Sequence, residues 1–326
     1  MLSLSYTDKS GKDGAGAQVL RYAFSYGLAK SFRVSWSHSS IKYIDSNPLD
    51  PFVLPSERKH FLKTLNNFIK PRKSTKRKPI FHFTIMRVLT KKQLASLLRI
   101  MSVFRGRYPL LAISLYRPQS YLGYFPNVIQ LFAEEIQSQL KTFSVHDDVI
   151  RIHAHIRGAI KSDRRTQPKF LLDIFRRFQR LLLEKKLSYT FTIFTDLPAE
   201  SKHWIPDSSN ELGTLRHWEE HALINSDGTM ELGFYNFENE FSEILNLRIV
   251  RDANAVEMWC EMSKSDILIG CDSSISILAG YLNLKAIKIF PCILQDVSPS
   301  DWKFYSPFEN INDLCDSTIE SMKQKQ

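Results

Sequence analysis

Two kinds of segment alternate along the chain: short strand-like runs of hydrophobic residues, and longer runs in which hydrophobic residues recur at helical spacing. In the first half the strand-like runs are Leu2–Tyr6, Phe32–Trp36, Ile80–Ile85 and Leu111–Tyr116. Helical spacing covers residues 17–31, 91–104 and 127–141. Strands separated by helices of this length are typical of β-α-β units, so the pattern predicts an α/β protein with parallel strands.

The second half repeats this alternation more clearly. An alternating apolar run begins at Val149, and Pro168 suits the first turn of the helix that follows it. The later predicted elements are the strand Ser188–Phe194, the strand Asp266–Gly270, a helix at 274–284 and the strand Ala286–Phe290. The segment 198–251 is polar and rich in turn residues, so its elements are assigned only loosely.

A seam near Lys141–Asp148 separates the two halves. A length of 326 residues suits two domains of ordinary size. We therefore predict an N-terminal α/β domain at residues 1–145 and a C-terminal α/β domain at residues 146–326. Each domain is expected to be Rossmann-like, and the two are expected to face a cleft.

Composition and charge narrow the classes of partner. Hydrophobic residues make up 43% of the chain, which is enough for a substantial core, so disorder is not expected. The 44 lysine and arginine residues outnumber the 34 acidic residues and give a net charge of +10. This balance favours anionic partners such as nucleotides, nucleic acid or an anionic membrane surface, without choosing among them.

Cysteine spacing and hydropathy indicate the compartment. The four cysteines form no C-x-x-C pair, which argues against a zinc knuckle and fits a reducing compartment. No apolar run approaches the roughly 18 residues that a membrane span needs. We expect a cytoplasmic chain, either free or peripheral to a membrane.

A histidine and an arginine lie at the end of the predicted strand that begins at Val149. Ligands of open α/β sheets bind at the carboxyl ends of the strands, so residues that directly follow strands are the first candidates for a site. His155 and Arg157 lie two residues apart, on the same side of an extended chain. A guanidinium can bind two phosphate oxygens, and an imidazole can donate to a sugar or phosphate oxygen. The alternative is a surface arginine beside a buried structural histidine.

Asp196 and the triplet Asp272-Ser273-Ser274 also follow predicted strands. The triplet opens a helix, so the hydroxyl of Ser273 or Ser274 and the amide groups of the first turn could hold a phosphate. Helix capping by the same serines is the alternative interpretation.

A glycine-containing loop precedes the first helix. Gly14 and Gly16 match part of a dinucleotide-binding fingerprint, but Val19 stands where the third glycine would be, and no acidic residue ends the second strand. NAD is therefore disfavoured. The two glycines, with Gln18 close by, allow the backbone to approach a ligand at a helix start.

Taken together, these segments resemble the α-1,2-fucosyltransferases, within the superfamily that includes α-1,6- and protein O-fucosyltransferases. Residues 14–23, GAGAQVLRYA, look like the first loop and helix of that family, and His155-Ile156-Arg157 resembles its H-x-R motif. Residues 191–196 and 263–283 resemble its later nucleotide-site segments, so the resemblance covers most of the chain. The sequence departs from the family at Ala17, where asparagine is usual, and after Arg157, where no matching acid follows.

The resemblance implies a GT-B-like fold that transfers fucose from GDP-fucose to a glycan hydroxyl with inversion, without a metal or another cofactor. The N-terminal domain would hold the acceptor and the C-terminal domain the donor. Arg157 is carried over as the catalytic group that binds the donor pyrophosphate, because a fixed guanidinium stabilises the charge that develops on the leaving group. The remaining implied substrate contacts are Gly14, Gly16, Gln18, His155, Asp196, Asp272, Ser273 and Ser274. Asp13, His38 and Asp45 are candidate bases, and the sequence does not select one.

Two basic features and two alternative functions stay open. The run Lys70–Lys78 carries six positive residues in nine; it is either a solvated loop or a contact with an anionic membrane or a lipid-linked acceptor. The helix face with Arg176, Arg177 and Arg180 is expected to be solvated. The alternatives to a transferase are a non-catalytic glycan- or nucleotide-binding protein of the same fold and a basic nucleic-acid-binding α/β protein, the latter disfavoured because nucleic-acid motifs are missing.

Overall fold

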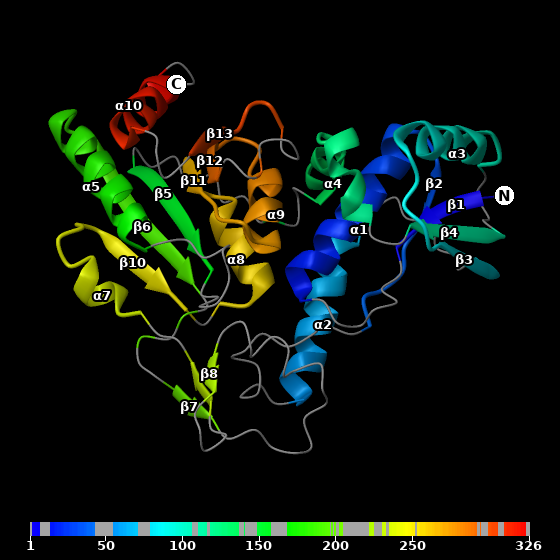
Figure 1. Cartoon of the computed structure of the whole chain (residues 1–326), viewed down its shortest axis with the longest axis horizontal. Coiled ribbons are helices and arrows are strands. Elements are labelled where there is room, and N and C mark those ends of the chain that lie inside the picture. The colour runs from blue at the N-terminus through cyan, green and yellow to red at the C-terminus, as the bar shows by residue number, and fades with distance from the viewer. Residues whose placement is uncertain are drawn as a thin grey trace. The chain divides into compact units, whose positions relative to one another are not determined.

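The computed structural model divides the chain into two compact units (Figure 1). It describes residues 2–6, 14–42, 55–70, 79–105, 110–115, 118–136, 140, 149–157, 168–195, 197, 199, 202–204, 222–224, 230–232, 235–251, 253–291, 294, 299–305 and 310–323. The first unit comprises residues 1–45, 53–142 and 296–299, and the second comprises residues 46–52, 143–295 and 300–326. The predicted boundary at residue 145 falls outside the described residues.

The first unit is built on a four-stranded parallel sheet with the order β2-β1-β4-β3. Its strands are β1 (Leu2–Ser5), β2 (Ser35–Ser37), β3 (Phe81–Ile85) and β4 (Leu111–Leu115). Its helices are α1 (Ala15–Ser31), α2 (Pro55–Ile69), α3 (Lys91–Val103), the 3-10 helix η2 (Pro118–Tyr124) and α4 (Val128–Ile136). Thr90 starts α3 with a capping box, in which its hydroxyl accepts from the amide of Gln93.

Aromatic side chains fill the core of the first unit. The ring of Tyr22, in α1, meets Trp36 at 5.1 Å and Phe132 at 5.9 Å, both edge to face. Helices α1 and α4 pack closely because residue 27 is glycine: a Cβ there would overlap the carbonyl oxygen of Val128. The interior of this unit therefore combines a wide aromatic layer with one close helix contact.

The second unit is built on a six-stranded parallel sheet with the order β10-β6-β5-β11-β12-β13. Its strands are β5 (Val149–Ile156), β6 (Ser188–Thr195), β10 (Leu247–Val250), β11 (Ile267–Ile269), β12 (Ile287–Pro291) and β13 (Lys303–Tyr305). Its helices are α5 (Pro168–Glu184), α7 (Phe237–Glu240), α8 (Ala255–Met262), α9 (Ser274–Leu282) and α10 (Ile311–Lys323).

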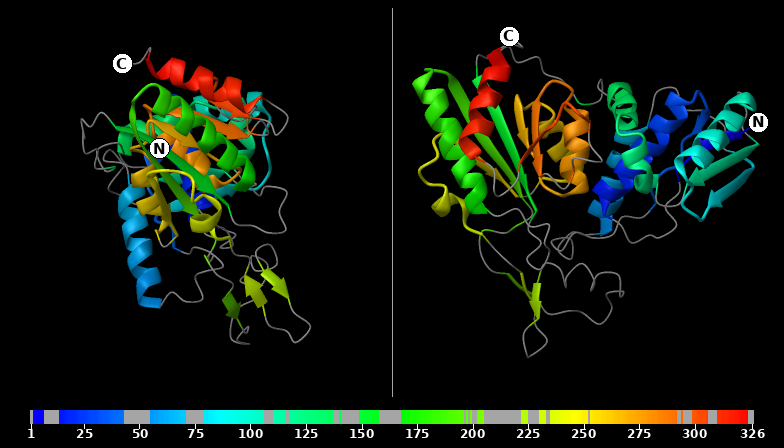
Figure 2. Two further views of the ribbon diagram at one scale, coloured as in Figure 1. Left: turned by 90° about the vertical axis from the view of Figure 1, so that its left-hand side faces the viewer. Right: turned by 45° about the horizontal axis from the view of Figure 1, so that its top comes forward.

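Helices cover both faces of this larger sheet. Figure 2 shows α5 and α10 on one face and α9 on the other. Each unit is thus a parallel sheet with helices packed on it, and the prediction of two Rossmann-like α/β units is confirmed. Whether the two units face a cleft stays a prediction.

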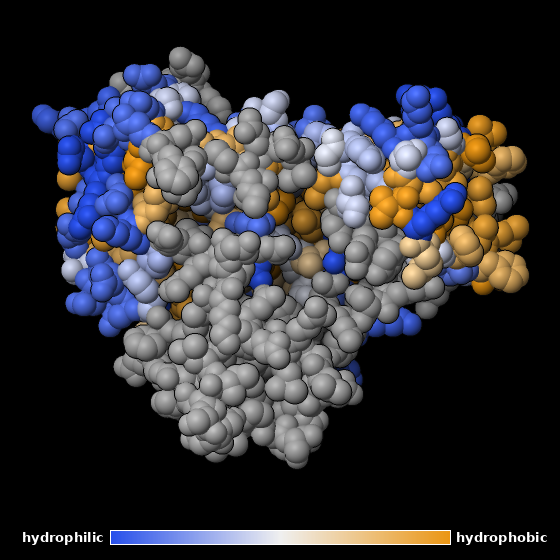
Figure 3. All heavy atoms as spheres, in the orientation of Figure 1, coloured by the Kyte–Doolittle hydropathy of each residue, from blue (hydrophilic) through white to orange (hydrophobic). Residues whose placement is uncertain are grey.

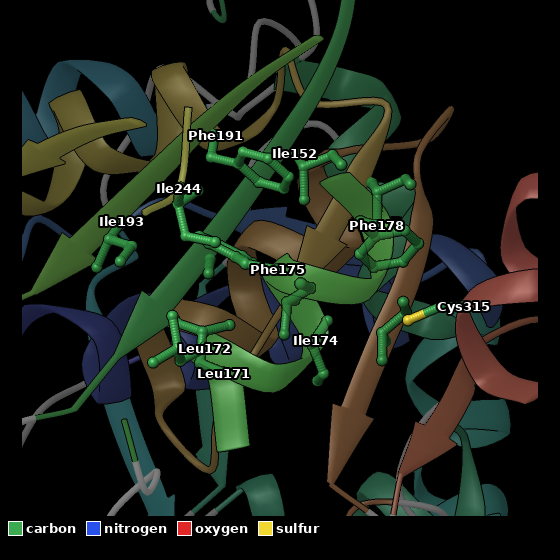
Figure 4. Close-up of a cluster of buried hydrophobic side chains, with 14 of the residues drawn as sticks. Ile152, Leu171, Leu172, Ile174, Phe175, Phe178, Phe191, Ile193, Ile244 and Cys315 are labelled. Atoms are coloured by element: carbon green, nitrogen blue, oxygen red, sulfur yellow. The ribbon is translucent and has the colours of Figure 1, made fainter. Parts of the chain in front are cut away.

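The core of the second unit fixes which way β5 faces. Ile152, Ala154 and Ile156 are buried in a cluster with α5, where Phe175 stacks on Phe191 at 4.5 Å (Figure 4). Because side chains alternate along a strand, His155 points to the opposite face, the side of α9. The packing of the apolar face of β5 against α5 therefore fixes the direction in which His155 points.

The strands and helices that the sequence predicts are present, with a later start for β2. The sequence did not predict α2, η2, α8, β13 and α10. Strand β2 begins at Ser35 rather than Phe32, because Arg33 takes a left-handed φ of 56° and Val34 donates to the carbonyl of Ala29, which closes the end of α1. The loosely assigned segment 198–251 contains β10, α7 and a three-stranded antiparallel sheet. That sheet has the order β7-β9-β8, with β7 (Lys202–Trp204), β8 (Ala222–Ile224) and β9 (Met230–Leu232).

Candidate functional site

The end of β5 and the start of α9 meet at the carboxyl edge of the second unit's sheet. Strand β11, which precedes α9, pairs with β5 in parallel register, with Ile269 opposite Ala154. The next residue of β5, His155, is buried, and its Nδ1 lies 2.6 Å from the Oγ of Ser276 in α9. One short hydrogen bond thus joins two segments that are 121 residues apart in sequence.

The loop between β11 and α9 is held on both sides. The backbone amide of Cys271 donates to the Oγ of Ser276 over 3.2 Å, and the hydroxyl of Tyr305 donates to the carbonyl of Gly270 over 3.2 Å. A Cβ at residue 270 would overlap the ring of Phe290, so any residue other than glycine would require that ring to move. The start of the loop is therefore closely packed against Phe290, and the amide of Cys271 ties it to α9.

A thiol completes the buried group. The Sγ of Cys271 lies 3.4 Å from the Nδ1 of His155 and 3.4 Å from the Oγ of Ser276. We call these three residues, His155, Cys271 and Ser276, the buried triplet. All three side chains are buried. They therefore link the end of β5 to the start of α9 and do not present a nucleophile to solvent.

The start of α9 also carries two further serine side chains and the backbone amides of its first turn. Ser273 is the N-cap, and its hydroxyl accepts from the amide of Ile275 over 3.3 Å. The capping alternative is therefore realised for Ser273. Ser274 is the first residue of the helix and is half-buried, as are Asp272 and Ser273. Unsatisfied amide groups at a helix start attract anions, so this turn is chemically suited to a phosphate.

Arg157 and Asp196 complete the predicted donor-side residues. Arg157 directly follows β5 and is half-buried, at the same edge as Asp272. Asp196 lies outside the described residues. The structure thus brings His155, Arg157 and the start of α9 to one edge. It also shows that Nδ1 of His155 is already engaged by protein atoms.

The carboxyl edge of the first unit carries a second polar group. The hydroxyl of Tyr22 lies 2.6 Å from the Nδ1 of His38, and the indole N–H of Trp36 donates to the same hydroxyl over 3.3 Å. The Tyr22 hydroxyl accepts from Trp36, and the direction of its bond to His38 depends on the tautomer of the ring. Burial lowers the pKa of His38 to about 4, which keeps the ring neutral near pH 7.

This network bears on His38, one of the three candidate bases. Its ring is neutral and already hydrogen-bonded at Nδ1, and its role as general base stays a prediction. Asp13 and Asp45, the other two candidates, lie outside the described residues.

The predicted glycine loop opens α1. Gly14 is the N-cap, with φ −64°, so its conformation does not require glycine, and a Cβ built on it meets no described atom within 4 Å. Gly16 and Gln18 are buried in the first turn, and the amide of Gln18 donates to the carbonyl of Gly14 over 3.2 Å. Neither packing nor strain within the described residues accounts for glycine at position 14.

The basic run Lys70–Lys78 and the three arginines of α5 have different environments. Lys70 is exposed at the end of α2, and residues 71–78 of the basic run lie outside the described residues. On α5, Arg176 and Arg180 are exposed, as predicted. The prediction for Arg177 is wrong: its guanidinium binds both carboxylate oxygens of Asp316 in α10, each over 2.7 Å, so it links two helices.

Two features are absent from the described residues. These residues contain no group of three or more histidine, cysteine, aspartate or glutamate residues placed to hold a metal ion. None of their helices combines the length and the apolar character that crossing a bilayer requires.

No protein-family model matches the sequence, and the comparison with curated proteins found no match. Among solved structures, the chain is similar to the E. coli heptosyltransferase WaaC with ADP, with a TM-score of 0.43 and 9% identity over 100% of both chains. It is similar to a glycosyl transferase of family 9 from Veillonella parvula, with a TM-score of 0.36 and 11% identity over 100% of this chain and 97% of that one. For the UDP-GlcNAc 2-epimerase from Methanocaldococcus jannaschii the TM-score is 0.34, with 11% identity over 98% and 69% of the two chains. Values this low carry no argument about family or activity.

Proposed function

We propose that the chain is a glycosyltransferase that takes its sugar from a nucleoside diphosphate sugar, with the donor pyrophosphate bound at the carboxyl edge of the second unit's sheet. The observation that carries the proposal is the hydrogen bond of 2.6 Å between His155 and Ser276, which joins the end of β5 to the first turn of α9. A strand-end arginine and a helix start at one edge are the two kinds of group that hold a pyrophosphate in α/β folds.

Arg157 has the central chemical role in this proposal. Cleavage of the bond between the sugar and the nucleoside diphosphate leaves negative charge on the pyrophosphate, and a fixed guanidinium stabilises that charge most in the transition state. The amide groups at the start of α9 act in the same direction through the helix dipole. Asp272 and Ser274, at the same edge, are proposed contacts of the nucleotide or the ribose.

The buried triplet suggests how His155 contributes. If the hydroxyl of Ser276 accepts from the amide of Cys271 and donates to Nδ1 of His155, the imidazole carries its proton on Nε2. That nitrogen then donates to a sugar or phosphate oxygen and does not remove a proton. His155 is thus proposed as a donor-side contact whose ring orientation is set by Ser276.

GDP-fucose is the proposed donor, and a glycan hydroxyl the proposed acceptor. This choice rests on the resemblance of residues 14–23, 155–157 and 263–283 to the α-1,2-fucosyltransferases. A Cβ at Gly14 would meet no described atom within 4 Å, which supports a ligand approaching the first unit at the start of α1. Transfer with inversion is part of the same proposal.

A thermal-shift panel tests the donor class first. GDP, ADP, UDP, CMP, their sugar derivatives and NAD are compared at equal concentration, and a ligand of the native state raises the melting temperature by mass action. We expect GDP and GDP-fucose to raise it most. If NAD alone does so, the transferase proposal fails. If GDP binds but GDP-fucose is neither hydrolysed nor used for transfer, the chain is a non-catalytic binding protein.

Metal independence is part of the proposal and has its own measurement. Turnover of the sugar donor should be unchanged by EDTA, because Arg157 and the start of α9 supply the positive charge that a metal would otherwise supply. Turnover that is lost with EDTA and restored by Mn²⁺ would contradict this assignment of roles.

A further inference from the structure

Large hydrophobic side chains are exposed together on one part of the first unit. Nine of the fourteen large hydrophobic residues that are exposed in the described part of the chain lie between residues 80 and 110. All nine are more than half exposed, and we call six of them the apolar face: Ile80, Phe81, Phe83, Val103, Phe104 and Leu110. Figure 3 shows the corresponding orange surface over β3 and α3. Exposed apolar residues gathered in this way mark a contact surface.

Backbone contacts show that the apolar face follows one edge of the sheet. The amide of Phe81 donates to the carbonyl of Leu110 over 2.9 Å, and the amide of Leu2 donates to the carbonyl of Phe104 over 2.9 Å. Leu111 pairs with Phe81 on one side and with Leu2 on the other. These residues begin their parallel strands, so Phe81, Phe104 and Leu110 lie at the amino edge, away from the carboxyl edge with Tyr22 and His38.

The segment that bears this face has an extreme charge. Residues 58–133 contain sixteen lysine or arginine residues and no aspartate or glutamate. The rest of the chain has 28 basic and 34 acidic residues, a net charge of −6. Arg87, Arg99 and Arg105 are exposed and alternate in sequence with the apolar residues. Within the described residues, no ion pair joins any of these three to a carboxylate.

The exposed hydrophobic residues and the positive charge of the segment together narrow the class of partner. A second copy of the same face would bring the positive charges of two segments together, so self-association is opposed electrostatically. Nucleic acid would suit the arginines, but a phosphate backbone offers nothing to bury Ile80, Val103 and Leu110. An anionic bilayer surface satisfies both features, because its headgroups attract cations while its acyl boundary takes up apolar side chains.

We propose that the apolar face docks on an anionic lipid bilayer, with Phe81, Val103 and Phe104 entering the interface and the arginines of the same segment contacting lipid headgroups. The occupant is the membrane surface itself, and no helix enters the bilayer core. Docking at the amino edge leaves the carboxyl edge of the same sheet, where ligands bind in such folds, away from the lipid. The proposal does not depend on which sugar donor the second unit binds.

Vesicle sedimentation with the full chain tests this proposal. Vesicles of phosphatidylcholine alone are compared with vesicles that contain about 30% phosphatidylserine, a proportion that gives a negative surface potential. We expect the wild-type chain to sediment with the anionic vesicles and at least about tenfold more weakly with the neutral ones. Raising NaCl from about 0.1 M to about 0.5 M should weaken the electrostatic part without abolishing the apolar part.

Two variants separate the apolar from the electrostatic contribution. Phe81→Ser/Val103→Ser/Phe104→Ser should lower the partition coefficient on anionic vesicles at least about tenfold, because three interfacial side chains are lost. Arg99→Gln/Arg105→Gln should lower it about 25-fold and flatten its salt dependence, since each cation near an anionic leaflet contributes about fivefold. All five side chains are exposed, so these changes remove no core packing.

A matched control comes from the second unit. Leu183→Ser/Arg180→Gln changes one exposed hydrophobic residue and one exposed cation on α5, and it should bind vesicles within about twofold of the wild type. Arg157→Ala should also bind vesicles like the wild type, which separates this proposal from the proposed function. Equal binding to neutral and anionic vesicles, or wild-type binding by the triple serine variant, would overturn the proposal. So would a wild-type dimer, seen by sedimentation equilibrium, that the triple serine variant converts to a monomer.

Discussion

Replacing Ser276 by alanine tests the buried triplet at the proposed donor site. The side chain of Ser276 is fully buried, and its Oγ lies 2.6 Å from Nδ1 of His155 and 3.2 Å from the amide nitrogen of Cys271. Ser276→Ala removes this one atom and leaves both of its partners in place. It is therefore a small change in volume and a large change in hydrogen bonding.

The expected cost follows from the two groups left behind. A buried polar group that loses its partner costs about 1–3 kcal/mol. The Sγ of Cys271 lies 3.4 Å from Nδ1 of His155 and remains as a weak substitute for the lost hydroxyl. The cost of leaving His155 without Ser276 should therefore lie near the lower end of this range. We therefore expect Ser276→Ala to lower the free energy of unfolding of the second unit by about 2–3 kcal/mol. Affinity for GDP should fall as well, because the loop Gly270–Ser273 loses a contact.

Urea unfolding followed by tryptophan fluorescence measures this loss. Trp259 and Trp302 are buried in the second unit and report its unfolding. Ser274→Ala is the matched control: it is the same substitution two residues earlier in α9, at a half-buried position, and should change stability by less than about 0.5 kcal/mol. If Ser276→Ala unfolds within about 0.5 kcal/mol of the wild type with an unchanged m-value, the reasoning from the triplet is refuted.

Three further predictions concern the second unit. Turnover should fall in the order wild type, Arg157→Lys, Arg157→Ala, with the alanine variant losing about 2–4 kcal/mol of transition-state stabilisation, whereas Arg180→Ala should leave kcat/KM unchanged. Burial lowers the pKa of His153 from 6.5 to about 4. Between pH 6.5 and pH 4 the unfolded chain therefore binds a proton at this histidine that the folded chain does not bind. Stability should then fall by about 2 kcal/mol from pH 6.5 to pH 5, and a urea titration at both pH values should show a smaller fall for His153→Gln. Gly270→Ala should lower the melting temperature measurably, because its Cβ would overlap the ring of Phe290; an unchanged melting temperature would show that the ring can move aside.

The elements with one-sided apolar patterns were the ones that the sequence could predict. Helix α5 was found because its buried residues recur at helical spacing, and β5 because its residues alternate. Strand β10 was not found, since the short run Leu247–Val250 is a half-exposed edge strand with Arg248 in it. Helix α8 had a readable signal in the capping box of Asn254 and Glu257, which the loose assignment of the segment before it obscured.

The site was predictable only as far as its position. Residues that end strands could be identified from local patterns, which is how His155, Arg157 and the start of α9 were selected. The partner of His155 could not be found in this way, because its contact with Ser276 depends on β11 pairing with β5, and sheet order is a non-local property. The same reason explains the error on Arg177, whose partner Asp316 is 139 residues further along the chain.

The parallel sheet of the first unit explains how one small domain could serve two kinds of contact. Its strands all run the same way, so their two ends form two chemically different edges. The carboxyl edge has Ser5, which donates to the carbonyl of Ser37, and His38, held by Tyr22. The amino edge has Phe81 and Phe104, exposed within a segment that lacks acidic residues. An antiparallel sheet would mix strand starts and strand ends at each edge. Because the strands here are parallel, substitutions at Phe81 and Phe104 should alter lipid binding without altering the carboxyl edge of the same sheet. The proposed donor site belongs to the second unit, so the two proposals are independently testable.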